Sequence, residues 1–110
     1  MKSAKSIIKM FKGCKVTHFD IIDGYLHYFR IRTKTGGEST YKFNVEDITY
    51  TFKKLSLCAQ TPMMWSLIIK ERKRADEVRM ALMALIDEET IIPPYCMEEA
   101  RRISQYAKAA

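Results

Sequence analysis

The sequence predicts an α+β domain: an antiparallel β-sheet or partly open barrel of five to six strands, capped by one C-terminal amphipathic helix. Between Cys14 and Glu71 the chain is rich in Val, Ile, Thr, Tyr and Phe, with turn signals at short intervals, which indicates consecutive strands. From Ala75 onward the apolar residues recur with the helical period instead. A chain of 110 residues, 47% hydrophobic and 29% charged, has the length and composition of one folded domain.

Three regions follow from this pattern: an N-terminal amphipathic helix at 1–13, the sheet with its helix at 14–90, and a helical tail at 91–110. The apolar residues of the first region have helical spacing, and Gly13 is a plausible helix stop. They are Ala4, Ile7, Ile8 and Phe11, with lysines between them. Because Lys9 and Lys12 interrupt its apolar stretch, we expect no secretory signal here.

The first hairpin is predicted from an Asp-Gly dipeptide at positions 23–24, which favours a two-residue type I′ turn. This turn joins a strand at Lys15–Ile22 to a strand at Tyr25–Lys34. It places Asp20 opposite His27, where a cross-strand ion pair is a simpler interpretation than a catalytic dyad.

The second hairpin is constrained by which residues share a face. The apolar set comprises Phe29 and Ile31 on one strand, and Tyr41, Phe43 and Val45 on the next. Both sets face one core only when paired residue numbers have an even sum, so we predict an odd-length loop, most simply Thr35-Gly36-Gly37. That register places Arg30 opposite Lys42.

The remaining elements are strands at Ile48–Lys54 and Met63–Lys70, separated by a loop at 60–62, followed by the capping helix. The helical stripe consists of Ala75, Val78, Leu82, Leu85, Ile86 and Glu89. Asp76 and Glu77 are expected in its first turn, where the helix dipole favours anions. A Pro-Pro pair at 93–94 stops the helix and begins the tail.

The net charge of +6 permits an anionic partner without requiring one. A candidate anion-binding patch comprises Arg30, Arg32, Lys34 and Lys42 on the polar sheet face, with the cluster Lys70, Arg72, Lys73 and Arg74. The simpler interpretation is a solvated face. Because most aromatic residues of the hairpin fall on the opposite, core side, the patch lacks the stacking residues of an RNA-binding sheet.

Four methionines are candidates for a protein interface: Met63, Met64, Met80 and Met83. The first two precede Trp65, which we expect in the core. The other two lie off the main helical stripe, on a side that could meet the tail or a second subunit.

No catalytic motif is present, so we predict a protein that is not an enzyme and needs no cofactor. Cys14, His18 and His27 lack a fourth partner and make a poor zinc site. Three distant cysteines indicate reduced thiols and a cytoplasmic location. The apolar runs are too short for a transmembrane segment.

The strand-rich segments "DGYLHYFRI" and "STYKFNVEDITYTFKK", followed by "MMWSLIIKERKRADEVRMALMALI", resemble the pleckstrin-homology-like (PH-like) superfold in its short bacterial form. The resemblance covers Lys15 to Ile86. It implies a binding or scaffolding domain whose ligand is a protein, a peptide, a phosphoinositide or a second copy. In phosphoinositide-binding members a basic residue on the first strand and a basic-x-basic triplet on the second make the contact, and Lys15 and the triplet at 30–32 match these positions.

Two functions therefore follow from the sequence. The first is a small non-enzymatic domain that mediates protein interaction or self-association. The alternative is a basic nucleic-acid-binding accessory protein that uses the cationic sheet face. An anionic-membrane binder acting through Ser3–Lys12 is a third, weaker hypothesis.

Overall fold

The structure, a computed structural model, describes residues 4–46, 50–57, 63–69 and 72–109, with side-chain burial described for 5–46 and 75–109. It is an α+β fold. In chain order the elements are α1 (Ala4–Lys9), β1 (Lys15–Ile22), β2 (Leu26–Arg32), β3 (Glu38–Asn44), β4 (Tyr50–Leu57), β5 (Met63–Ile69), α2 (Arg72–Met83), the 3₁₀-helix η1 (Pro94–Cys96) and α3 (Met97–Ala109).

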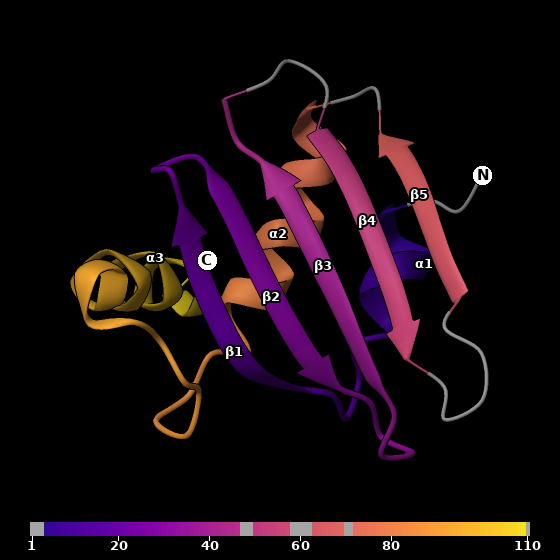
Figure 1. The fold of residues 1–110 in the computed structure, drawn as a ribbon, viewed down its shortest axis with the longest axis horizontal. Coiled ribbons are helices and arrows are strands. Elements are labelled where there is room, and N and C mark those ends of the chain that lie inside the picture. The colour runs from indigo at the N-terminus through magenta and orange to yellow at the C-terminus, as the bar shows by residue number, and fades with distance from the viewer. Residues whose placement is uncertain (1–3, 47–49, 58–62, 70–71, 110) are drawn as a thin grey trace.

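The predicted barrel of five to six strands capped by one C-terminal helix is wrong. The strands form an open antiparallel meander in the order β1-β2-β3-β4-β5, and no pairing joins β1 to β5 among the described residues. The part of this sheet whose core side chains are described is three-stranded, β1 to β3. Figure 1 shows α1 and α2 together behind the sheet, and α3 beside its β1 edge. Several helices thus replace the single cap.

The first hairpin has the predicted turn but a different register. Asp23 and Gly24 have φ values of 54° and 79°, and the Tyr25 N–H donates to the Ile22 carbonyl over 3.2 Å, as in a type I′ turn. Strand pairing then begins at Ile22 with Leu26, so His27 lies opposite Ile21 and Asp20 opposite Tyr28. The predicted pairing of Asp20 with His27 is therefore wrong.

A β-bulge changes the register again further along this hairpin. Val16 pairs with Ile31, but the next pair is His18 with Arg30, which leaves Thr17 as the extra residue. The bulge allows Val16 before it and Phe19 after it to face the same core. Paired residue numbers in this hairpin therefore have an even sum between the turn and the bulge and an odd sum beyond the bulge.

In the second hairpin the paired residue numbers have an even sum and the loop has an odd number of residues, as predicted. The loop has five residues, 33–37, and not three. Arg32 pairs with Glu38, Arg30 with Thr40 and Tyr28 with Lys42. The predicted pair of Arg30 with Lys42 is therefore wrong. Between β2 and β3 this register sets no two cations directly opposite each other, whereas Arg32 lies opposite Lys15 in β1 and Lys42 opposite Lys53 in β4. The Lys42 Nζ lies 5.8 Å from the centre of the Tyr28 ring.

The core lies between the sheet and the two helices behind it. Phe29 is central: its ring is 4.8 Å from that of Phe19 and 5.7 Å from that of Phe43, and its side chain is fully buried. From α1 and its exit, Ile7 and Phe11 are buried, and the Phe11 ring meets Tyr41 edge-on at 5.4 Å. The N-terminal helix is thus part of the core and not an appendage.

The capping helix begins and ends earlier than its apolar stripe predicts. It starts at Arg72, so Asp76 and Glu77 do not lie in its first turn, and that prediction is wrong. Beyond Met83 the chain turns, yet Ile86 remains buried because the turn packs it on the same core. Glu89 lies outside the helix. The second proline of the Pro-Pro pair begins η1, and α3 follows it.

The outer edge of β1 is occupied by the segment that follows α2. Phe19 N–H donates to the Ile91 carbonyl over 3.0 Å, and Ile91 N–H donates to the Thr17 carbonyl over 2.8 Å. This parallel bridge between His18 and Ile91 closes the edge at the bulge. It also holds the chain before η1 against the polar face of the sheet.

Candidate binding surfaces

The eight cations of the predicted anion-binding patch are only partly placed together. Arg30, Arg32 and Lys42 share the polar face of β2 and β3, while Lys34 lies in the loop, with its aliphatic carbons beside Gly13. Lys70 lies outside the described residues. Arg72, Lys73 and Arg74 begin α2, in the part of the chain whose side chains are not described.

The polar face of the sheet carries acids as well as these cations. Glu38 lies opposite Arg32, and Asp20 lies opposite Tyr28 on the same side of the sheet. Lys15, at the start of β1, has its Nζ 3.9 Å from a Glu89 carboxylate oxygen. The described residues therefore do not form the uniformly cationic surface that a polyanion would need.

A small cavity of about 160 Å³ lies on this face, where the sheet meets the segment that closes the β1 edge. It is lined by His18, Phe19, Asp20, Tyr28, Arg30, Ile91 and Pro93. Arg30 is the predicted residue that this cavity brings to a defined site. Its Nε atom is buried and has no hydrogen-bond partner.

A larger cavity of about 590 Å³ forms a groove between α2 and α3. Its lining combines charged and apolar side chains: Asp76, Arg79 and Met80 from α2, and Arg102, Ile103 and Tyr106 from α3. Met80, a predicted interface residue, therefore lies in the groove, whereas Met83 is fully buried in the core. Met63 and Met64 lie in β5, among the side chains that are not described.

One wall of the groove is tied to the sheet through a buried histidine. The Arg79 guanidinium donates to Asp76 over 2.7 and 3.2 Å and lies 3.2 Å from Nδ1 of His27. His27 is 4% exposed, and burial lowers its pKa to about 4, with the Arg79 charge adding to the effect and Asp76 opposing it. A neutral His27 thus accepts from Arg79 and orients it along the groove.

Sequence reasoning missed this cluster and most of the groove. The sequence pattern predicts Asp76 only as an acid in the first turn of the helix, and it does not distinguish Arg79 from the other cations. The available signal was the spacing of Asp76 and Arg79, three residues apart on one helix. In the tail, Arg102, Ile103 and Tyr106 have the corresponding spacing of a helix face.

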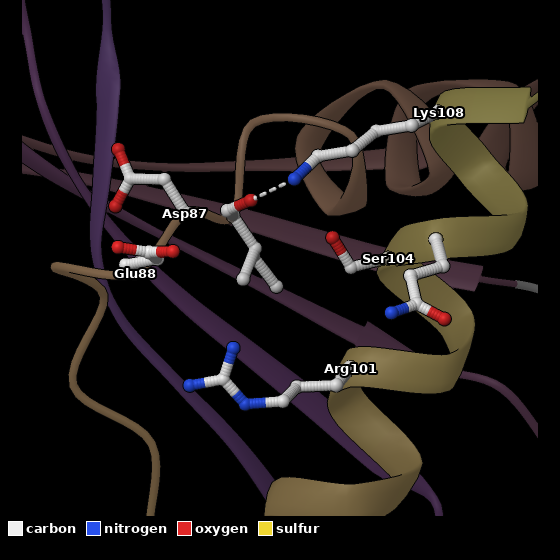
Figure 2. A pocket seen from close by; sticks show the side chains of 7 residues that line it. Asp87, Glu88, Arg101, Ser104 and Lys108 are labelled. Atoms are coloured by element: carbon white, nitrogen blue, oxygen red, sulfur yellow. Dashed lines mark hydrogen bonds between the residues drawn. The ribbon is translucent and has the colours of Figure 1, made fainter.

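A third cavity, of about 200 Å³, lies where the turn after α2 meets α3 (Figure 2). Lys108 extends from α3 and donates to the Ile86 carbonyl over 2.6 Å, while Arg101 extends toward the turn that carries Asp87 and Glu88. The Ile86 carbonyl belongs to the turn that follows α2, so the lysine ties α3 to this turn. This site therefore has a structural explanation: it fastens α3 to the turn after α2.

The tail is also fastened to β1 by a second set of contacts. The Tyr95 hydroxyl donates a short hydrogen bond to an Asp20 carboxylate oxygen, which raises the pKa of Tyr95 to about 12. The Cys96 Sγ lies 3.9 Å from the same oxygen. Burial, with the nearby Asp20 charge, raises the pKa of the Cys96 thiol, so this cysteine is not an activated nucleophile.

Within the described ranges no three His, Cys, Asp or Glu side chains gather as metal ligands would. His18 and His27 point to opposite faces of the sheet and so do not share a site, while Cys14 is buried and its thiol donates to the Met10 carbonyl over 3.4 Å. In the part of the chain that is described, every helix is too short or too polar to cross a membrane.

Comparison with known proteins gives no relative: no family model, no curated protein and no solved structure matches the chain. The resemblance to the PH-like superfold stays a prediction. Function must therefore be argued from the surfaces themselves.

Proposed function

We propose that the protein is a small non-enzymatic interaction domain of the cytoplasm that self-associates through the groove between α2 and α3. The observation that carries this proposal is the groove itself, the largest of the cavities described above at about 590 Å³. It combines Met80, Ile103 and Tyr106 with two arginines. Tyr, Met and Arg are enriched where proteins bind one another, and no nucleophile and base are paired here.

Tyr106 supports an interface in particular, because its side chain is 71% exposed beside the half-buried Met80 and Ile103. A phenol exposed on an otherwise polar helix gains by burying its ring while its hydroxyl keeps a polar contact. Covering this ring and the groove would remove the apolar surface of Met80, Ile103 and Tyr106 from water.

The charges of α3 favour a second copy of the chain as the occupant. Its first turn holds Glu98 and Glu99, both exposed, whereas Arg101, Arg102 and Lys108 follow further along. The helix of 13 residues is about 20 Å long. Two such helices placed antiparallel set Glu99 of each copy near Arg102 of the other, which gives a two-fold interface with matched charges.

Light scattering coupled to size-exclusion chromatography, over a wide range of loading concentrations, tests this proposal. We expect the mass to rise from one chain toward two with increasing concentration. Tyr106→Glu should hold the protein at the mass of one chain, because it places a charge among the apolar side chains of the interface. Tyr25→Glu, in the turn between β1 and β2, is the matched control and should associate as the unchanged protein does. A single-chain mass at every concentration would remove the proposal.

A further inference from the structure

The cavity on the polar face of the sheet is a built site and not a surface irregularity. His18 and Asp20 come from β1, Tyr28 and Arg30 from β2, and Ile91 forms the remaining wall. That wall is held in place by two backbone hydrogen bonds to β1, of 2.8 and 3.0 Å. The cavity therefore keeps its shape without a ligand, which lowers the entropic cost of binding one.

Arg30 lacks a partner where one is expected. Its Nε is buried without a hydrogen-bond acceptor, and the guanidinium makes no hydrogen bond or ion pair to any described residue. Only its backbone carbonyl is engaged, by the Thr17 hydroxyl at 3.2 Å. Arg30 also lines the cavity, so the part of its guanidinium that faces the cavity is available to an acceptor that enters it.

A histidine side chain lies beside Arg30 in the cavity. His18 lies opposite Arg30 in the strand pairing, and its Nδ1 is 3.0 Å from the Thr17 hydroxyl. The other ring nitrogen is left to face a ligand or solvent, since no contact to a described residue engages it. A planar guanidinium beside an imidazole suits a planar acceptor with two oxygens, which a carboxylate provides.

The Asp20 carboxylate lines the cavity and therefore limits the negative charge that a bound ligand can carry. The same carboxylate accepts the hydrogen bond from the Tyr95 hydroxyl. A dianionic phosphate would meet this charge at close range, whereas a monoanion is repelled less. The walls made by Tyr28, Ile91 and Pro93 are apolar or aromatic and suit a hydrophobic body attached to the anionic group.

We propose that this cavity, formed by His18, Tyr28 and Arg30 with the wall at Ile91 and Pro93, binds a carboxylate that carries a small apolar or aromatic group. The Arg30 guanidinium holds the two carboxylate oxygens by paired hydrogen bonds, and the apolar group lies against Tyr28 and Ile91. The ligand is either a free small carboxylic acid or the C-terminal carboxylate of a peptide. The site lies on the sheet, apart from the α2–α3 groove, and does not depend on self-association.

Titration of the full-length ¹⁵N-labelled protein with benzoate, followed by amide NMR, tests the site. Benzoate should shift the signals of His18, Tyr28 and Arg30 saturably, while benzamide and inorganic phosphate leave them in place. Arg30→Gln should weaken benzoate binding by about tenfold or more, the loss expected for a bidentate charged contact. The matched control Arg32→Gln, an exposed arginine on the same face of β2, should change it by less than about twofold.

A second arm identifies the source of the carboxylate. A short peptide ending in Phe with a free C-terminus is compared with the same peptide as its C-terminal amide. Tighter binding of the free-acid peptide than of benzoate assigns a chain end as the ligand, and tighter binding of benzoate assigns a small acid. The proposal is overturned if benzoate leaves the three signals unchanged up to its solubility. It is equally overturned if phosphate shifts them as benzoate does, or if both arginine variants weaken binding alike.

Discussion

The Nη1 atom of Arg79 lies 3.2 Å from Nδ1 of His27, a contact between residues 52 positions apart that joins α2 to β2. The histidine is almost fully buried on the core side of the sheet, with its ring 5.7 Å from that of Phe19. The same guanidinium holds Asp76 at the edge of the groove between α2 and α3. The core of the sheet and the proposed interface are thus linked through one arginine.

The pKa of His27 gives the first prediction, which concerns stability against pH. Because its pKa is about 4 in the folded protein and 6.5 when unfolded, only the unfolded state is protonated between these values. The free energy of unfolding should be highest above pH 6.5 and fall as the pH drops toward 4, by up to about 3 kcal/mol. Urea denaturation at a series of pH values measures this.

His27→Phe is the control for this effect, since it keeps an aromatic ring in the core and removes the titrating group. The variant should lose most of the pH dependence in that window, although its stability at neutral pH falls because Arg79 loses a partner. An equal slope in the variant and the unchanged protein would show that other groups cause the effect.

The second prediction concerns the hydroxyl that holds the turn after α2 on the sheet. Thr90 is 5% exposed, and its Oγ1 donates to the Val16 carbonyl over 2.7 Å and accepts from the Asp87 N–H at 3.1 Å. Thr90→Val keeps the shape but leaves both groups without this partner, so it should lower the free energy of unfolding by about 1–3 kcal/mol. Thr35→Val, in the exposed loop, should change it by less than about 0.5 kcal/mol. Equal effects in denaturant melts would contradict the assignment.

The third prediction concerns the ionisation of Tyr95, whose pKa of about 12 results mainly from its hydrogen bond to Asp20. The hydrogen bond to the Asp20 carboxylate stabilises the protonated hydroxyl of Tyr95, and the carboxylate charge repels the phenolate. Asp20→Asn should therefore lower the pKa of Tyr95 toward its ordinary value of 10. Absorbance titration of the phenolate follows this, and Tyr95→Phe identifies which step belongs to Tyr95. If the pKa of Tyr95 is the same in Asp20→Asn as in the unchanged protein, the hydrogen bond to Asp20 is not what raises it.

Several elements of this fold could be predicted from the sequence because local chemistry determines them. The strand at Lys15–Ile22 and the type I′ turn after it follow from alternation and from the Asp-Gly pair. The odd length of the second loop follows from the core side of Phe29 and Tyr41. The tail helix after the Pro-Pro pair is likewise a local outcome.

Other features depend on contacts between distant residues and have no local signal. The bulge at Thr17 is required by the core and closed by Ile91, 74 residues later. The open sheet with two helices behind it could not be distinguished from a capped barrel by the strand pattern alone. For the sites, Arg30 was predicted, but its neighbours His18 and Asp20 depend on the register, and the groove depends on how α3 packs on α2.

The central claim, self-association through α3, is tested most directly by exchanging charges between Glu99 and Arg102. Glu99→Arg and Arg102→Glu each create like charges across the proposed two-fold interface, so each variant alone should remain a single chain. Lys34→Glu reverses a charge in the exposed loop between β2 and β3, away from α3, and should associate as the unchanged protein does.

An equimolar mixture of the two variants restores an acid opposite a base at both contacts. Sedimentation equilibrium of this mixture should give a complex of two chains with an affinity within about tenfold of the unchanged protein. A mixture that stays at the mass of one chain, while the unchanged protein associates, would contradict an interface in which Glu99 meets Arg102.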